Sequence, residues 1–158
     1  MGDELGDELV LRTAEDADVP AMAAIRAAES QSQALWEYRI GGYLQGTYSP
    51  QQALPERSCW VAVQGGELAG FVAGHRTVRF ACDGELQWIN VAQEFRGQGI
   101  STRLTDVMLS WFRQKNMNRI CVNVGVDNTV ARHLYARHGA VAMNDGWMEW
   151  RDLRQSAL

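Results

Sequence analysis

The chain has 158 residues, of which 46% are hydrophobic and 22% are charged, and its net charge is −4. This length suits one domain, and the hydrophobic content together with six tryptophans excludes a disordered chain. No apolar run approaches the ~20 residues that a membrane-spanning helix needs, and the acidic balance argues against a general nucleic-acid binder. We therefore expect a single globular domain whose partners are neither nucleic acid nor membrane.

The charges are unevenly distributed along the chain. Four of the 19 acidic residues lie in a leader at residues 1–9, where Gly-Asp-Glu-Leu occurs twice. We expect this leader to be a flexible tail or a remnant of an expression vector, and we place the domain at residues 10–158. Within the domain, residues 10–95 carry six basic and ten acidic side chains, whereas residues 96–158 carry nine and five.

Three cysteines, Cys59, Cys82 and Cys121, lie in apolar segments that resemble strands. Their number is odd, and neither a Cys-x-x-Cys pair nor a Cys/His metal spacing is present. We therefore predict buried free thiols in a reducing compartment and no bound metal. Because the start lacks the basic and apolar pattern of a signal peptide, a cytoplasmic location is the default expectation.

The N-terminal part of the domain predicts a strand followed by two helices. The strand is expected at residues 10–12. The first helix is capped by Asp16 or Asp18 and carries a proline in its first turn, where proline is tolerated. Apolar residues from Leu35 onward predict the second helix, which we expect to end at Gly41-Gly42.

The central part predicts an antiparallel meander. Glycines and prolines make residues 41–57 a loop or a short helix. Three β-rich stretches follow, joined by turns at Gly65-Gly66 and near Asp83-Gly84. The strands are expected at residues 59–63, 68–78 and 85–91.

The C-terminal part alternates between helices and strands. Apolar residues at positions 100, 104, 107, 108, 111 and 112 form one helical stripe that ends near Lys115. A second helix starts at Asp127 or Asn128 and stops at Gly139. Strands are expected at residues 120–124, 141–143 and 147–150. The whole pattern predicts one α/β (α+β mixed) domain with helices on the faces of a mixed sheet.

The sharpest local motif lies between the third of the central strands and the long helix, and it reads Arg96-Gly97-Gln98-Gly99-Ile100-Ser101. Two glycines permit a tight turn, and the following helix start offers unpaired amides and a positive dipole end, which favours an anion. A P-loop would need a lysine, and a dinucleotide fingerprint would need a third glycine, so both fail. A turn that binds nothing is the structural alternative.

Asn128 and Tyr135 form a second candidate constellation. They are seven residues apart, about two helical turns, so they share one helix face and could line one elongated ligand. Taken singly, Asn128 also fits a helix N-cap, and Tyr135 also fits a core position of an amphipathic helix.

Together these motifs resemble the GCN5-related N-acetyltransferase (GNAT) family over residues 10–150. The resemblance rests on the strand at residues 85–91 with the motif after it, and on the helix that carries Asn128 and Tyr135. Ser101 stands where the family pattern usually has Gly or Ala, and it is still small enough for a phosphate. The resemblance implies a mixed, mostly antiparallel twisted sheet of six to seven strands, flanked by about four helices and splayed between the fourth and fifth strands.

The resemblance also implies acetyl-CoA as the co-substrate, with no metal. Backbone groups of Ile89, Asn90 and Val91 would pair with the pantetheine arm, Asn128 would bond the arm, and Tyr135 would lie near the sulfur. The pyrophosphate would be held by the turn and the first helical residues: Arg96, Gly97, Gln98, Gly99, Ile100, Ser101 and Thr102.

Direct transfer to an amine needs a base for the ammonium proton and an acid for the departing thiolate. Tyr135 matches the family's general-acid position, and Glu85 stands where several members carry their general base. An exposed strand-end carboxylate is the alternative for Glu85. Gln87, further along the same strand, could order a relay water instead.

The acceptor pocket is expected among aromatic segments, and the candidate residues are Trp36, Tyr43, His75 and Gln87. An aromatic wall suits a cationic amine, although most of these rings could equally be core or subunit contacts. The split of charges predicts positive potential around residues 96–103 and negative potential near Glu85.

The sequence therefore predicts an acetyl-CoA-dependent N-acetyltransferase acting on a primary amine of a small molecule, amino acid or peptide. One alternative is a GNAT-fold acyl-CoA-binding or sensing module without turnover. Another is transfer of a different acyl group, or transfer to a hydroxyl. A homodimer is compatible with the sequence.

Overall fold

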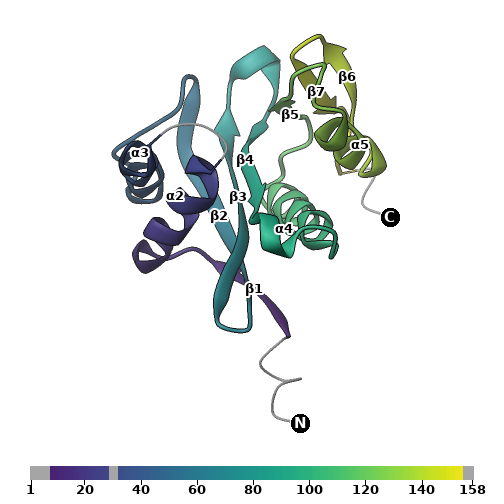
Figure 1. Cartoon of the computed structure of the whole chain (residues 1–158). Coiled ribbons are helices and arrows are strands. Elements are labelled where there is room, and N and C mark those ends of the chain that lie inside the picture. The colour runs from purple at the N-terminus through teal and green to yellow at the C-terminus, as the bar shows by residue number, and fades with distance from the viewer. Residues whose placement is uncertain (1–7, 29–31, 155–158) are drawn as a thin grey trace.

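The computed structural model describes residues 8–28 and 32–154. One seven-stranded sheet has the strand order β1-β2-β3-β4-β5-β7-β6, and every neighbouring pair is antiparallel except β4 and β5. Four α-helices flank this sheet in the described part (Figure 1). The predicted fold class and the strand and helix numbers are thus confirmed.

The strands are β1 (Leu9–Thr13), β2 (Ala53–Gln64), β3 (Glu67–Thr77), β4 (Gly84–Val91), β5 (Ile120–Asn123), β6 (Val141–Asn144) and β7 (Trp147–Trp150). The α-helices are α2 (Val19–Ala27), α3 (Gln33–Gln45), α4 (Ile100–Gln114) and α5 (Thr129–Arg137), and the 3-10 helices are η1 (Asp16–Asp18), η2 (Arg79–Ala81) and η3 (Gln93–Phe95). The first strand thus includes Leu9, the last residue of the expected leader, while residues 1–7 of that leader lie outside the described residues.

Helix α3 continues through Gly41-Gly42, so the predicted end at this pair is wrong. A Cβ at Gly42 would lie 2.7 Å from the Cβ of Tyr48. Glycine is therefore needed at this position for close packing against the following chain. The helix ends at Gly46, whose φ of +82° places it in the left-handed region that closes many helices.

Strand β2 begins at Ala53, within the segment predicted as a loop or short helix, so this prediction is wrong at both ends. Pro55 lies between the register pairs Ala53–Thr77 and Arg57–His75, where the ladder to β3 is interrupted. The N–H that proline lacks therefore costs no ladder hydrogen bond at this point.

Asp18 anchors the chain between β1 and α2. Its carboxylate accepts hydrogen bonds from Nη1 and Nη2 of Arg12 at 2.8 and 2.9 Å, and from the backbone N–H of Glu15 at 2.8 Å. The hydrogen bond from Arg12 is the main reason why the pKa of Asp18 lies below its usual value. The pair thus holds the ionised carboxylate where α2 starts.

Replacing Arg12 with Met should lower the free energy of unfolding by about 1 kcal/mol at pH 7, because the pair is partly exposed. A lowered folded pKa stabilises the fold above the unfolded pKa of about 3.9, and this stabilisation disappears as the pH falls through the folded value. The variant should therefore approach the parent in stability at acidic pH. Urea unfolding at pH 7 and at low pH measures the difference, with the exposed Arg103 changed to Met as the control.

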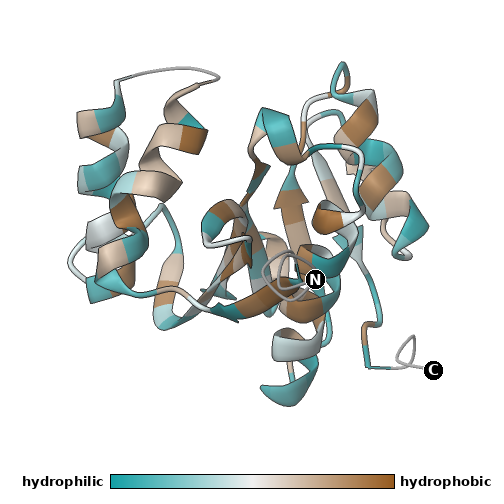
Figure 2. Cartoon of the chain, turned by 60° about the horizontal axis from the view of Figure 1, so that its bottom comes forward, coloured by the Kyte–Doolittle hydropathy of each residue, from teal (hydrophilic) through white to brown (hydrophobic). Residues whose placement is uncertain are grey.

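Both faces of the sheet are covered by helices. Helices α2 and α3 bury one apolar cluster, in which Trp36, Tyr43 and Trp88 meet the middle strands. Helices α4 and α5 bury the other, which includes Leu104, Phe112 and Trp150. Figure 2 shows much of the hydrophobic colour on the sheet and on the helix turns facing it. Among the described residues, no helix combines the length and the apolar character needed to cross a bilayer.

The sheet opens between β4 and β5, as expected. Their parallel pairing covers only residues 84–86 of β4 and residues 120–122 of β5. The next residue, Gln87, forms a β-bulge, because β3 pairs Gly74 with Leu86 and Ala73 with Trp88. Beyond the bulge β4 stays with β3, while the chain after β5 turns away toward α5. This divergence creates the space in which the candidate site lies.

The three cysteines are buried free thiols, which confirms that part of the prediction. The reducing compartment inferred from them stays a prediction, and so does the cytoplasmic location.

Candidate active site between the splayed strands

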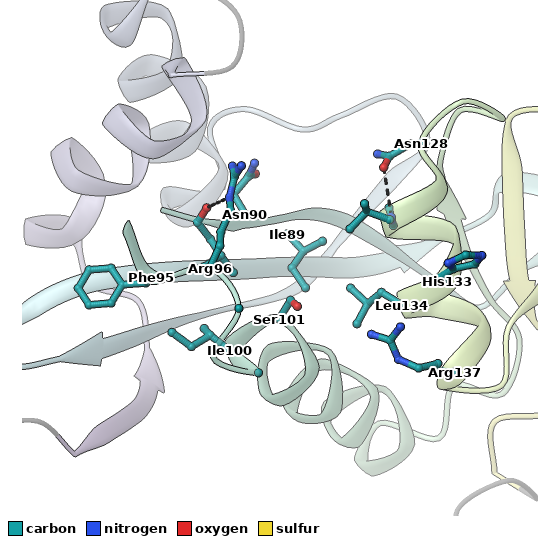
Figure 3. A pocket seen from close by; sticks show the side chains of 15 residues that line it. Ile89, Asn90, Phe95, Arg96, Ile100, Ser101, Asn128, His133, Leu134 and Arg137 are labelled. Carbon is teal, nitrogen blue, oxygen red and sulfur yellow. Dashed lines mark hydrogen bonds between the residues drawn. The ribbon is translucent and has the colours of Figure 1, made fainter. Parts of the chain in front are cut away.

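A cavity of about 710 Å³ lies beside the splayed half of β4. The end of β4, the glycine motif and α5 each contribute side chains to it (Figure 3). Its walls contain Ile89, Asn90, Val91, Phe95, Arg96, Gly97, Gly99, Ile100, Ser101, Asn128, Val130, Ala131, His133, Leu134 and Arg137. Most of the predicted coenzyme-binding residues therefore lie together around one space, whereas Gln98, Thr102 and Tyr135 are outside this lining.

The glycine motif forms the turn that the sequence suggested. Gly97 and Gly99 have φ angles of +80° and +79°, in the left-handed region where a Cβ is disfavoured. Helix α4 begins directly after Gly99, so the first amides of its first turn lack intrahelical partners. Arg96 donates from Nε to the carbonyl of Val91 at 3.1 Å, which fixes the turn against the end of β4. The arrangement is an anion site with a formal positive charge beside it.

Changing Gly99 to Ala should weaken acetyl-CoA binding by about tenfold, because the left-handed conformation costs an alanine about 1–2 kcal/mol. Relaxation of this strain would rotate the amides at the start of α4 away from the phosphates. Isothermal titration calorimetry measures the affinity. Gly46 to Ala is the matched control, since its φ is +82° and, as at Gly99, an added Cβ would meet nothing within 4 Å. Equal losses of affinity in the two variants would contradict a local role of Gly99.

Helix α5 forms the opposite wall. Its N-cap is Asn128, whose Oδ1 accepts a hydrogen bond from the N–H of Ala131 at 3.1 Å. Asn128 therefore acts as a helix N-cap, which was the alternative to a ligand-binding role, and it also lines the cavity. Sequence reasoning missed His133 and Arg137, which add polar and basic groups to this wall (Figure 3). Their spacing of four residues on one helix was the signal that could have identified them.

A second cavity, of about 360 Å³, adjoins the first. It shares Ile89, Asn90, Asn128 and Ala131 with the first, so the two spaces meet at the bend of β4. Its other lining residues are Arg26, Glu85, Leu86, Gln87, Trp88, Val122, Asn123, Val124, Gly125 and Tyr135. Glu85 and Tyr135, the two predicted catalytic residues, thus lie on the walls of one cavity.

Glu85 is a buried carboxylate with only 5% of its surface exposed, which excludes the alternative of an exposed strand-end residue. Its Oε1 accepts a hydrogen bond from Nε of Arg79 at 3.0 Å and lies 3.7 Å from Nε2 of His75. Nδ1 of His75 is 3.0 Å from the hydroxyl of Tyr43. Both contacts engage Oε1, and no described residue donates a hydrogen bond to Oε2.

Tyr135 is 4% exposed and its ring meets the ring of Trp150 edge to face, with centroids 5.8 Å apart. Burial raises the pKa of its hydroxyl to about 12, an effect that the nearby Arg26 partly opposes. No described residue forms a hydrogen bond with this hydroxyl. The phenol therefore stays protonated at physiological pH and keeps its proton available to a ligand.

The predicted acceptor-pocket residues are placed differently from one another. Gln87 lines the second cavity, whereas Trp36, Tyr43 and His75 are buried and line neither cavity. Guanidinium groups of the chain already occupy the faces of these rings. Arg26 and Arg39 lie 4.7 and 5.0 Å from the Trp36 ring, and Arg57 lies 4.7 Å from that of Tyr43. The rings of Trp36 and Tyr43 thus contact arginines of the chain itself, in the position where the prediction placed a cationic amine.

The expected acidic character near Glu85 is likewise offset by basic groups. Arg79 pairs directly with Glu85, and Arg26 lines the same cavity. Sequence reasoning missed Arg26 because α2 reaches this region only through tertiary packing.

Residues 28–140 match the family model of the acetyltransferase (GNAT) family. The chain belongs to this family.

A curated relative, the probable N-acetyltransferase camello of Xenopus tropicalis, is 30% identical over 87 residues, which is 54% of this chain and 40% of the relative. The chain spans less than half the length of the curated relatives it matches. Among solved structures, Ard1 from Thermoplasma volcanium has a TM-score of 0.71 at 21% identity, covering 91% of this chain and 97% of that one. The PaiA N-acetyltransferase from Thermoplasma acidophilum, solved in complex with coenzyme A, has a TM-score of 0.68 at 14% identity, covering 91% and 99%. Both likenesses show the shared fold.

Proposed function

We propose that the protein is an acetyl-CoA-dependent N-acetyltransferase that moves the acetyl group directly to a primary amine. The observation that carries this proposal is the meeting of two cavities at the bend of β4, with a buried carboxylate and a buried phenol on the walls of the smaller one. The curated relatives carry the name N-acetyltransferase, which supports an amine as acceptor.

The larger cavity fits coenzyme A in its chemistry. Amides at the start of α4, with Arg96 beside them, suit the pyrophosphate. His133 and Arg137 add further donors on the α5 side. The edge of β4 beyond its pairing with β5 leaves backbone groups of residues 89–91 for an extended arm. Acetyl-CoA, when bound, would supply the acetyl group as a thioester.

Glu85 and Tyr135 would carry the two proton transfers. An alkylammonium is no nucleophile, so Glu85 accepts its proton through Oε2, directly or through a water at Gln87. The amine nitrogen then forms a bond to the acetyl carbon, and the carbon–sulfur bond breaks. Tyr135 donates its proton to the departing sulfur, which leaves as a thiol. The nitrogen then gives up the second proton that it must lose to become an amide, and this proton restores the Tyr135 hydroxyl, directly or through water. Arg79 holds Glu85 in place throughout.

Two measurements test the proposal. Calorimetry should show that acetyl-CoA binds the full chain, and an assay of thiol release with a panel of amines should detect turnover that depends on the amine. Failure of acetyl-CoA to bind at millimolar concentration would refute the function altogether. Tight binding with thiol release at background for every amine would instead identify an acyl-CoA-binding module.

A further inference from the structure

The charged side chains on the smaller cavity, among the described residues, are one guanidinium and one carboxylate. Arg26 comes from the last turn of α2, and Glu85 comes from the start of β4. A cavity with a cationic and an anionic group on its walls complements a ligand that carries both charges. A polyamine would place a further cation in this space and would offer nothing to Arg26.

Arg26 is held in a defined position. Its Cζ lies 4.7 Å from the centroid of the Trp36 ring, and its Nη1 donates to Oδ1 of Asn90 at 3.0 Å. A guanidinium stacked on an aromatic ring and fixed at one nitrogen is preorganised, so little conformational entropy is lost when it binds a carboxylate. Asn90 belongs to both cavities, which places this contact at their junction.

The guanidinium also lies near the reacting centre. Arg26 and Tyr135 line the same cavity, and the charge of Arg26 opposes the rise in pKa that burial imposes on Tyr135. An anionic group of the acceptor held by Arg26 would therefore lie in the same cavity as the amine that reacts.

Gln87 supplies a matching acceptor for the amine. Its Oε1 is buried and has no hydrogen-bond partner among the described residues, although Gln87 lines the cavity. A buried carbonyl oxygen without a donor is costly, and an ammonium or amine N–H satisfies it. Gln87, which forms the bulge in β4, lines the same cavity as Glu85, so both acceptor residues belong to the walls around one ligand.

We propose that the acceptor is a free α-amino acid, with its carboxylate on Arg26 and its amine between Glu85 and Gln87. This inference rests on the proposed N-acetyltransferase function. A volume of about 360 Å³ accommodates an amino acid. In a peptide N-terminus the first residue presents a neutral amide where an amino acid presents the carboxylate, so the charge-assisted hydrogen bonds from the carboxylate to the guanidinium would be lost.

The first experiment compares L-amino acids with their own carboxamides, which keep the side chain and the amine and lose the negative charge. With the full chain and acetyl-CoA, kcat/KM should favour the acid by roughly ten- to a hundredfold, the range for losing a charge-assisted hydrogen bond. Carboxamides that react as well as the acids would overturn the inference. So would exclusive acetylation of polyamines or peptides, and that result would leave the proposed function intact. Absence of acetyl-CoA binding would refute both.

The second experiment uses Arg26→Met, with Arg39→Met as the matched control. Both arginines contact the Trp36 ring, but only Arg26 lines the cavity. Arg26→Met should raise KM for the acid about tenfold or more and remove the preference over the carboxamide. Arg39→Met should keep the preference. An equal loss for acid and carboxamide in Arg26→Met would show a structural role and overturn the inference.

Binding gives a readout that is independent of turnover. Calorimetric titration of the preferred amino acid into the full chain saturated with coenzyme A should show binding that is weakened about tenfold or more by Arg26→Met and is retained in Arg39→Met. Equal affinity in the parent and in Arg26→Met would contradict a carboxylate contact.

Discussion

Replacement of Tyr135 with Phe should lower kcat by about a hundredfold or more, the contribution typical of general acid catalysis. The pKa of about 12 keeps the proton on the phenol, so the side chain can donate it to a departing thiolate. The substitution removes only the hydroxyl, which no described residue binds, and it leaves the ring packed against Trp150. Steady-state rates of thiol release, measured with a saturating amine, give the size of the effect.

The affinity for acetyl-CoA and the thermal stability of the Tyr135→Phe variant should match the parent, because packing is preserved. Tyr38 to Phe is a suitable control, since Tyr38 is 72% exposed on α3 and away from both cavities. Ionisation of Tyr135 should not reduce the activity of the parent until strongly alkaline pH, because burial has raised the pKa of the Tyr135 hydroxyl. A loss of kcat below about threefold would remove Tyr135 from the role of proton donor.

Local patterns in the sequence predicted those elements whose structure depends on local interactions. The apolar stripe from Ile100 to Phe112 became α4, because a helix that covers a sheet needs one continuous apolar face. The Gly65-Gly66 turn appeared as expected, since both residues adopt positive φ. Gly41-Gly42 misled the prediction because glycine there permits close contact with Tyr48, and such a contact between segments is invisible to periodicity.

The candidate site was predictable where one contiguous segment builds it. The turn at residues 96–101 carries its own glycines and its own helix start, so its anion-binding character follows from the sequence. Arg26 was missed because α2 approaches β4 only in the folded chain. Arg79 was missed although it lies only six residues before Glu85, because the turn through η2 is what brings its side chain back onto the carboxylate. Both arginines come from the acidic half of the sequence, so that half places basic groups beside Glu85 as well. The expected negative potential at this end of the site stays a prediction.

Substitution of Glu85 with Gln should lower kcat/KM by about a hundredfold at neutral pH and change the shape of the pH profile. The amide keeps an oxygen for the hydrogen bond from Arg79, but it cannot take a proton. The reaction must then use the small fraction of acceptor that is already deprotonated. That fraction grows about tenfold per pH unit below the pKa of the amine, so the deficit of the variant should shrink steadily as the pH rises.

Glu149 to Gln is the matched control for Glu85. Glu149 is 4% exposed and accepts a hydrogen bond from Arg119 at 2.7 Å, so it reproduces the burial and the arginine partner of Glu85. It lies on β7, opposite Cys121, and lines neither cavity. The loss of an ion pair should therefore cost stability in both variants, whereas only Glu85→Gln should acquire the rising pH profile. Parallel profiles for the parent and Glu85→Gln would show that Glu85 positions its neighbours without accepting the proton, because a purely structural defect lowers the rate equally at every pH.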